Sequence, residues 1–467
     1  MPPAPSSELA SYADSPASAT AAELRTLFGL SAPIAAAQVG MMTMGVIDTM
    51  MVARIGAPEL AAVAIASTWA WSSGSLAQGI IHGMDPLVSQ AHGAGDHEGV
   101  ALALQRGLVI ASSISIPLAM LWLATADVLT LLGQDPEVAE LAGAYMLARL
   151  PSALGFNLFV AARQYLSGRT LTRPAMWVMF VCNALNVLLN WLLIFGHWGF
   201  PALGLIGAGI ATGLTNVLLP LMLWIWILRF RLHEGAWRPW DLRSFDLSGL
   251  TRHAVLGLPV GVQMALEANA FTVAMIFVGW MGVFELGAHQ IVINMASFTF
   301  MVPLGVSIGA SARAGNLIGS RDARQLRVAC RTGFLMGGGV MAIAAVSFIV
   351  FREALPRLYG ADPAVVALAA TLLPIAGAFQ IADGVQVVGA GLMRGMGRPQ
   401  AGAVVNLIGF YAVGLPLAYL LAFPLGLGIA GIWWGLAAGL GGVAAMLVIW
   451  VGRTSRRPIE ELSVRTS

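Results

Sequence analysis

Long apolar segments alternate with short polar breaks along almost the whole chain. Segments of at least about 20 apolar residues, without strict polar–apolar alternation, predict membrane-spanning helices rather than the strands of an outer-membrane barrel. Twelve segments show this pattern. Their approximate ranges are 27–53, 60–84, 107–132, 138–165, 174–196, 203–228, 254–281, 286–310, 333–351, 364–393, 400–423 and 427–451. We therefore predict an all-α polytopic membrane protein with twelve transmembrane helices.

Composition strengthens this prediction and excludes several classes of protein. The 467 residues are 58% hydrophobic and 10% charged, whereas soluble domains carry about 25% charged residues. All 25 basic residues are Arg, so the chain has neither a P-loop lysine nor a Schiff-base lysine, and an ATP-driven pump of the Walker type is excluded within it. Cys182 and Cys330 stand far apart and predict neither a disulfide nor a metal site. We expect no cofactor, no enzymatic activity and no nucleic-acid partner.

The Arg residues predict the orientation in the membrane. With the N-terminus inside, 21 Arg fall on the inner side and four on the outer side or near it. Since positive residues favour the cytoplasmic side, both termini are expected in the cytoplasm. Residues 1–20 are rich in Pro, Ala and Ser and are expected to form a disordered tail, and 453–467 a cytoplasmic tail. No cleavable signal peptide is apparent.

The chain also repeats itself, at a nearly constant spacing of close to half its length. Segment 30–33 (LSAP) matches 256–259 (LGLP), and several Asp, Gly, Glu and Arg positions recur in the same order. The matched pairs include Gly56 with Gly282, Asp96 with Asp322, Asp135 with Asp362, and Arg173 with Arg398. We predict two homologous six-helix bundles around a central cavity, 21–228 and 254–452, joined by a cytoplasmic linker at 229–253. Repeats with the same orientation are typical of secondary transporters that rock two bundles around a central site.

Three acidic residues lie well inside predicted spans: Asp48, Glu267 and Asp383. An ionised Asp at the bilayer centre costs about 2.5–3.5 kcal/mol even on lenient insertion scales, so such groups usually face a cavity, a partner or an ion. Their partner is therefore expected to be a proton, a metal cation or a cationic ligand. The alternative is a protonated or hydrogen-bonded carboxyl group that only fixes helix packing.

Polar and aromatic residues near these acids are further candidates for the cavity. Asn186 and Asn190 are four residues apart, so they share a helix face that could join Asp48. The alternative is interhelical hydrogen bonding without a role in transport. The complete set of polar or substrate-contacting candidates is Asn183, Asn186, Asn190, Gln263, His289, Gln290, Asn294, Phe271 and Phe379.

Four stretches of the chain carry specific motifs: GVIDTMM in the first predicted helix, LTRPAM followed by NVLLNWLLIFG, GAHQ in the eighth helix and DGVQVVGAGLMRG in the tenth. Together they resemble the multidrug and toxic compound extrusion (MATE) family, specifically its NorM-like bacterial branch. The resemblance covers roughly residues 24–455. It implies the MATE fold and antiport, in which an organic cation leaves as Na⁺ or H⁺ enters with alternating access.

The resemblance also implies roles for individual residues. Glu267 and Asp383 would bind the coupling cation in the second half, as Na⁺ ligands if the protein is sodium-coupled, and Asp48 would support transport in the first half. NorM-like members can carry a Tyr four residues before the acid at Asp383, where this chain has Phe379. Because hard cations need oxygen ligands, the missing hydroxyl leaves H⁺ open beside Na⁺ as the coupling ion.

The expected substrates are small drugs or toxic organic cations, and the expected location is the bacterial inner membrane, with the protein acting as a monomer in the lipid bilayer. A lipid-linked oligosaccharide flippase of the wider superfamily is one alternative. It should carry several Arg inside the spans, whereas the embedded charges here are acids. A passive channel is the other, and its flux should be independent of ion gradients.

Overall fold

The computed structural model describes residues 16–464, which form helices and connecting turns with no strand among them. Each of the twelve predicted segments coincides with a helix or with a set of consecutive helices. The bounds are α2 (Pro16–Val52), α3 (Ala57–Ile81), α4 (Met84–Gly93), α5 (His97–Leu123), α6 (Thr125–Leu131), α7 (Pro136–Ala148), α8 (Ser152–Gly168), α9 (Arg173–Phe195), η1 (His197–Gly199), α10 (Gly204–Arg229), η2 (Leu242–Phe245), α11 (Leu247–Gly279), α12 (Val283–Gly319), α13 (Ala323–Val350), α14 (Ala354–Arg357), α15 (Pro363–Gly395), α16 (Gln400–Asn406), η3 (Leu407–Gly414), α17 (Leu415–Ala422), α18 (Gly428–Thr454) and α19 (Ile459–Leu462). The all-α prediction is confirmed.

Ten helical segments in the described part of the chain are long and apolar enough to cross a membrane. An eleventh span is formed if α7 and α8 are counted together, although they bend by 53° at their junction. The sequence predicted one continuous segment at 138–165, and the bend corrects that expectation. Pro151 explains the break, because proline cannot donate the backbone hydrogen bond that a continuous helix needs. The α3 helix has 25 residues but is not among these spans.

The repeated Asp residues have a structural reason, since each caps the start of a helix. Asp96 accepts a hydrogen bond of 2.8 Å from the Gly99 backbone at the start of α5, and Asp322 accepts one of 2.8 Å from Gln325 at the start of α13. Asp135 and Asp362 cap α7 and α15 in the same way. A side-chain acceptor at this position satisfies backbone N–H groups that the helix leaves unpaired.

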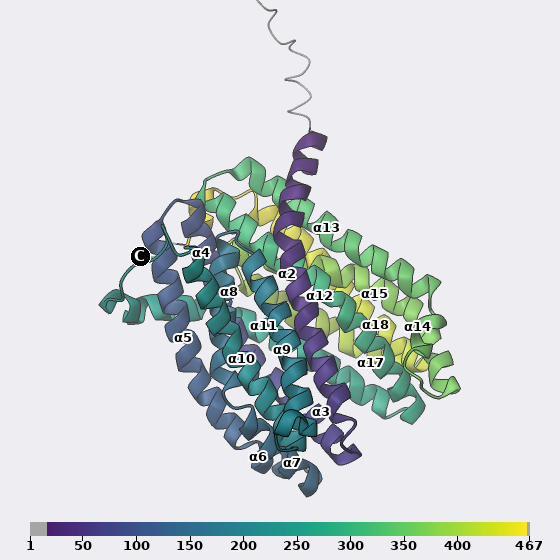
Figure 1. Cartoon of the computed structure of the whole chain (residues 1–467). Coiled ribbons are helices and arrows are strands. Elements are labelled where there is room, and N and C mark those ends of the chain that lie inside the picture. Colours follow the sequence, from purple (N-terminus) through teal and green to yellow (C-terminus); the bar gives the residue numbers. More distant parts are fainter. Residues whose placement is uncertain (1–15, 465–467) are drawn as a thin grey trace, which may run out of the picture. The chain divides into compact units, whose positions relative to one another are not determined.

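The chain divides into two compact units that do not follow its linear order exactly. Unit 1 comprises the described residues up to Ala35 together with Ala270–Ser463, and unit 2 comprises Ala36–Asn269 and Val464. Both α2 and α11 therefore contribute their first part to one unit and their second part to the other. Within unit 2, α5 packs against α8 and α9 against α10 (Figure 1). Within unit 1, α15 packs against α12, α13 and α18.

Closely packed glycines recur at the same spacing that relates Pro33 to Pro259. In unit 2, a Cβ atom on Gly79 would lie 2.1 Å from the Cα of Gly261. In unit 1, a Cβ atom on Gly305 would lie 2.5 Å from the Cα of Ala35. Positions 79 and 305 correspond in the two repeats, as do 261 and 35. The repeats therefore share a helix crossing that needs glycine because the two backbones are nearly in contact.

Several predicted boundaries change in the structure. Between the predicted segments 60–84 and 107–132 the structure contains the helix α4, whose residues 84–91 are all buried. Residues 1–15 of the expected disordered tail lie outside the described residues, and 16–20 form the first turns of α2. The C-terminal tail contains α19, with Ile459 and Leu462 buried. The predicted segment 400–423 contains the wider π-helical turns of η3.

Candidate functional site

Asp48 lies in unit 2, in the second part of α2, and is only 6% exposed. One carboxylate oxygen accepts a hydrogen bond from the Asn190 amide of α9. The other accepts a hydrogen bond of 3.1 Å from the Thr212 hydroxyl of α10. Both donors are neutral, so they satisfy the carboxylate oxygens without cancelling its charge.

The two Asn residues predicted to share a face do share it, and they extend this network. The Asn190 amide also donates to the Asn186 side chain at 3.1 Å, and the Asn186 amide donates to the Thr215 hydroxyl at 3.5 Å. The carbonyl oxygen of the Asn190 side chain is buried and has no hydrogen-bond partner. A buried acceptor without a donor is costly, which marks this oxygen as a place that could accept a hydrogen bond or bind a cation.

Asn183 does not join this network, although the sequence grouped it with the other two. Its amide donates to the backbone carbonyl of Gly40 at 2.7 Å. Gly40 lies more than two turns before Asp48 on α2, and a Cβ atom there would come within 3.1 Å of the Asn183 amide nitrogen. Asn183 therefore fixes the packing of α9 on α2.

Tyr145 and Arg149 belong to the neighbourhood of Asp48 and were not among the predicted site residues. Tyr145 on α7 is 2% exposed, and its hydroxyl is close to Thr212. Arg149 follows at the end of α7, where its guanidinium lies 5.5 Å from the centre of the Tyr145 ring and 5.6 Å from that of Trp122. Its positive charge acts on Asp48. The structure thus holds the Arg149 guanidinium over two aromatic rings of unit 2.

Unit 1 places Asp383 on α15, where it is 6% exposed. One turn earlier, Gln380 is fully buried and its amide is hydrogen-bonded at 2.6 Å to the Thr299 hydroxyl of α12. This pair ties α15 to α12 next to the acid.

An aromatic cluster surrounds the same stretch of α15 in unit 1. Phe379 lies 5.9 Å from both the Phe271 ring and the Trp433 ring, in edge-to-face geometry. His289 lies 5.5 Å from Trp433. The indole nitrogen of Trp433 and the Nδ1 atom of His289 are both buried without a hydrogen-bond partner. Aromatic faces of this kind attract organic cations, and the two unpaired ring nitrogens offer additional polar contacts.

The remaining candidates take different positions. Glu267 is partly buried on the section of α11 that belongs to unit 2, and Gln263 is 6% exposed one turn before it. Gln290 and Asn294 on α12 are exposed and bonded to each other at 3.2 Å. Glu267 and Asp383 thus belong to different compact units, and their joint binding of a cation stays a prediction.

Apolar helices long enough to span a membrane, an internal duplication and buried carboxyl groups within those helices together define a membrane transporter of the two-repeat class. A family model described as MatE matches residues 33–192 and 259–420. The chain belongs to the MatE family. The two matched segments begin at Pro33 and Pro259, the prolines that the sequence pattern places early in the first helix of each repeat.

Curated bacterial proteins and solved structures resemble nearly the whole chain. The multidrug resistance protein MdtK of Pectobacterium atrosepticum is 31% identical over 95% of this chain and 98% of its own. The probable multidrug resistance protein NorM of Rhizobium meliloti is 35% identical over 90% of this chain and 91% of its own.

Among solved structures, the eukaryotic MATE transporter AtDTX14 has a TM-score of 0.87 at 24% identity, covering 95% of this chain and 100% of its own. The Vibrio cholerae transporter VcmN in its bent form has a TM-score of 0.83 at 19% identity, covering 94% of this chain and 98% of its own. These likenesses confirm the MATE fold. With its many apolar helices, the chain is a multi-pass protein of the bacterial inner membrane.

Proposed function

We propose that this protein exports small, mostly cationic organic compounds by antiport against Na⁺ or H⁺, with alternating access. The names of the curated relatives, which describe multidrug resistance proteins, support a role in multidrug export, and the acids inside the spans are the reason to expect mostly cationic substrates. The observation that carries the coupling mechanism is Asp48, a buried carboxylate whose hydrogen-bond donors are neutral amide and hydroxyl groups.

The chemistry at Asp48 explains how a cation could be exchanged. Protonation converts one carboxylate oxygen from an acceptor into a donor. The unpaired carbonyl oxygen of Asn190 is then the acceptor that the new donor needs, and rotation of the amide would bring it to Asp48. With Na⁺ instead, the Asp48, Asn190 and Thr212 side chains would supply oxygen ligands. Either ion neutralises the carboxylate, which lowers the cost of closing the site.

The second site in this proposal is Asp383 together with the aromatic cluster of unit 1. Its carboxylate would balance the positive charge of a substrate or coupling ion, while the rings of Phe379, Phe271 and Trp433 would accept the flat apolar part of an organic cation. Glu267 completes the set of coupling acids in the proposal.

The membrane potential sets a limit on the stoichiometry. One charge crossing 100 mV contributes about 2.3 kcal/mol, or roughly fifty-fold accumulation of a neutral compound. A monovalent cation exchanged for one ion gains nothing from the potential, so its export would depend on the ion gradient or on two ions per cycle. We further propose that the protein acts as a monomer with both termini in the cytoplasm, as the Arg distribution predicts.

Uptake of ethidium or norfloxacin into inverted vesicles under an imposed Na⁺ or H⁺ gradient tests this function. The variants are Asp48→Asn, Glu267→Gln and Asp383→Asn, with Glu140→Gln on the exposed face of α7 as the matched control. We expect gradient-driven uptake by the unaltered protein and by the control, and strongly reduced uptake by the Asp48 variant.

The outcomes separate the alternatives. Unchanged gradient-driven uptake in all three acid variants would refute the coupling assignment. Flux that ignores both gradients would refute antiport and favour a passive channel. Transport of an anionic lipid-linked sugar, with no transport of cationic drugs, would instead favour a flippase.

A further inference from the structure

The linker between α10 and α11 is folded tightly onto α5 in unit 2. Gln105, which is fully buried, donates to the backbone carbonyl of Arg238 at 2.9 Å and accepts from the Ser244 hydroxyl at 2.7 Å. Arg106 donates to the backbone carbonyl of Arg243 at 3.3 Å. These contacts place the linker beside the third turn of α5.

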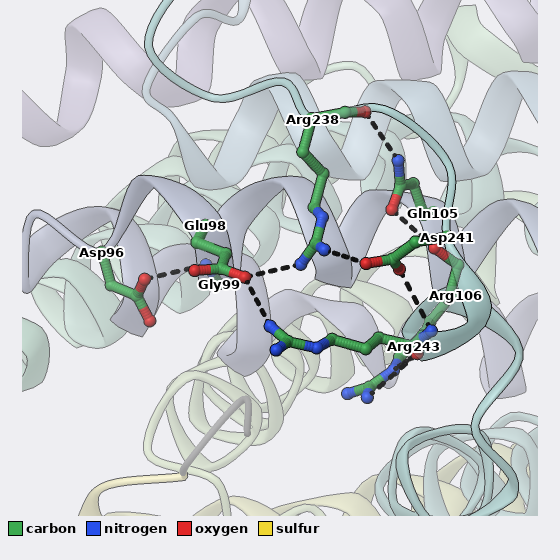
Figure 2. Close-up of polar contacts among 9 residues, drawn as sticks. Asp96, Glu98, Gly99, Gln105, Arg106, Arg238, Asp241 and Arg243 are labelled. Atoms are coloured by element: carbon green, nitrogen blue, oxygen red, sulfur yellow. Dashed lines mark hydrogen bonds and ion pairs between the residues drawn. The ribbon is translucent and has the colours of Figure 1, made fainter.

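The side of the linker toward the beginning of α5 is charged. Arg238 and Arg243 converge on Glu98, with N–O distances of 2.7 and 3.0 Å, and Arg238 also pairs with Asp241 (Figure 2). Arg106 lies 3.8 Å from Asp246. Each of these three guanidinium groups thus has a carboxylate partner.

The side of the linker toward the middle of α5 is aromatic and borders a cavity of about 580 Å³. Trp237 and Trp240 are each 44% exposed, and Phe245 is 58% exposed. The rings pair with neighbours: Trp237 with Trp224 of α10 at 6.2 Å, and Trp240 with Phe245 at 5.8 Å. The cavity continues along α5 past the exposed hydroxyl-bearing residues Ser112 and Ser113.

The order of these features along α5 matches the boundary of a bilayer. Ion pairs come first, at the level of Glu98, then the aromatic rings, and then an apolar groove on a spanning helix. Trp side chains favour this interfacial level, with apolar residues beyond it in the hydrocarbon. The volume also lies in the range of about 300–1,000 Å³ that is typical of small-molecule sites.

We propose that this groove is a binding site for a phospholipid of the leaflet on the linker side. The ester region lies near the Trp240 ring, and one acyl chain runs along Leu108 and Val109 and past Ser112 and Ser113 toward the middle of α5. Because the cations of the neighbouring charged cluster are paired with carboxylates, the site does not select an anionic headgroup, and zwitterionic phosphatidylethanolamine binds as well as an anionic lipid. This lipid site is separate from the proposed transport sites and does not depend on them.

Photolabelling of the full-length protein tests the proposal. The protein is reconstituted in phosphatidylethanolamine vesicles containing a trace of a phospholipid with a diazirine on its acyl chain, irradiated, digested and mapped by mass spectrometry. We expect labels concentrated in peptides covering 108–113 and 237–245. Trp240→Ala removes one wall and Ser113→Phe fills the groove, and each should reduce this labelling by about fivefold to tenfold, as loss of roughly 1 kcal/mol or more of binding predicts.

Trp177→Ala is the matched control, because Trp177 is 52% exposed on the second turn of α9, another spanning helix. It should leave the labelling of the groove unchanged. Labels spread evenly over all lipid-facing helices, or groove labelling that persists in Ser113→Phe, would overturn the proposal. So would labelling that appears only when phosphatidylglycerol replaces phosphatidylethanolamine, since the pairing of Arg106, Arg238 and Arg243 with carboxylates predicts no such preference.

Discussion

Unit 2 surrounds its buried acid with amides and hydroxyls, whereas the stretch of unit 1 that carries Asp383 is packed among aromatic rings. Asp48 accepts hydrogen bonds from Asn190 and Thr212. Phe379, one turn before Asp383, contacts Phe271 and Trp433 instead. The first environment suits a small, strongly hydrated ion, and the second suits a flat organic cation.

The comparison shows that duplication preserved the scaffold and not the chemistry. Gly79 and Gly305 occupy equivalent crossings, and both need the absence of a side chain. At the spacing that relates these two glycines, Asp48 corresponds to Ala274, and Glu267 corresponds to Met41. Each acid thus occurs in one repeat only, which is the arrangement expected if the two halves handle different steps of one cycle.

The largest effect on transport is expected when the Asp48 carboxylate is removed from its repeat, even if a carboxylate is added at the corresponding position of the other repeat. Asp48→Asn should reduce gradient-driven ethidium uptake at least about 100-fold, the equivalent of roughly 3 kcal/mol, because the amide can neither take up and release a proton nor neutralise a cation. The double variant Asp48→Asn/Ala274→Asp should not recover, because Ala274 is fully buried in the apolar cluster of unit 1. Rescue of uptake by the second substitution would show that the two sites are interchangeable.

The next effect concerns the packing that the repeats share. Gly79→Ala and Gly305→Ala should each lower stability by about 1–3 kcal/mol, because the added methyl group meets backbone atoms that cannot move aside. Melting of the purified protein in detergent measures this loss. Gly29→Ala on α2 is the control, since nothing lies within 4 Å of its added Cβ. A loss in one repeat without the other would contradict the proposed equivalence of the crossings.

A smaller effect should separate two Asn residues on the same helix. Asn190→Ala removes a donor to Asp48 and is expected to reduce gradient-driven uptake about tenfold, the equivalent of one charge-assisted hydrogen bond. Asn183→Ala removes a hydrogen bond to a backbone carbonyl, so it should lower the melting temperature. The protein that remains folded should keep most of its gradient-driven uptake. Equal transport losses in the two variants would argue against a special role of Asn190.

The sequence predicted the helices well because the length of an apolar segment is a local signal. The structure adds that the repeated residues Asp96 and Asp362 cap helix starts, which the repeat alone did not predict. The α4 helix was missed because its segment is short and polar, and its burial depends on contacts with distant parts of unit 2. The aromatic face of the linker was missed for a similar reason, since its rings line a cavity only when the linker is folded onto α5.

The candidate site was only partly predictable. Asp48 stood out because ionisable residues are rare inside spans, and the spacing of Asn186 and Asn190 predicted their shared face. Tyr145 and Thr212 carry no such signal, because single hydroxyl-bearing residues are common in transmembrane helices. Their relevance follows from helix packing that brings α7, α9 and α10 to Asp48.

The smallest expected effect tests the aromatic site of unit 1. Phe379→Tyr adds a hydroxyl one turn before Asp383, in a cluster where the nearby Trp433 indole nitrogen lacks a hydrogen-bond partner. The added oxygen is a potential ligand for a hard cation, so Na⁺-driven uptake should rise about two- to fivefold relative to H⁺-driven uptake. Phe410→Tyr is the control, because Phe410 is equally buried and contacts Phe271 from another helix. Both variants could instead change the ratio of Na⁺-driven to H⁺-driven uptake equally. Ion preference would then depend on the polarity of the whole aromatic cluster rather than on an oxygen next to Asp383. That result would remove the distinction between an ion site in unit 2 and an organic-cation site in unit 1.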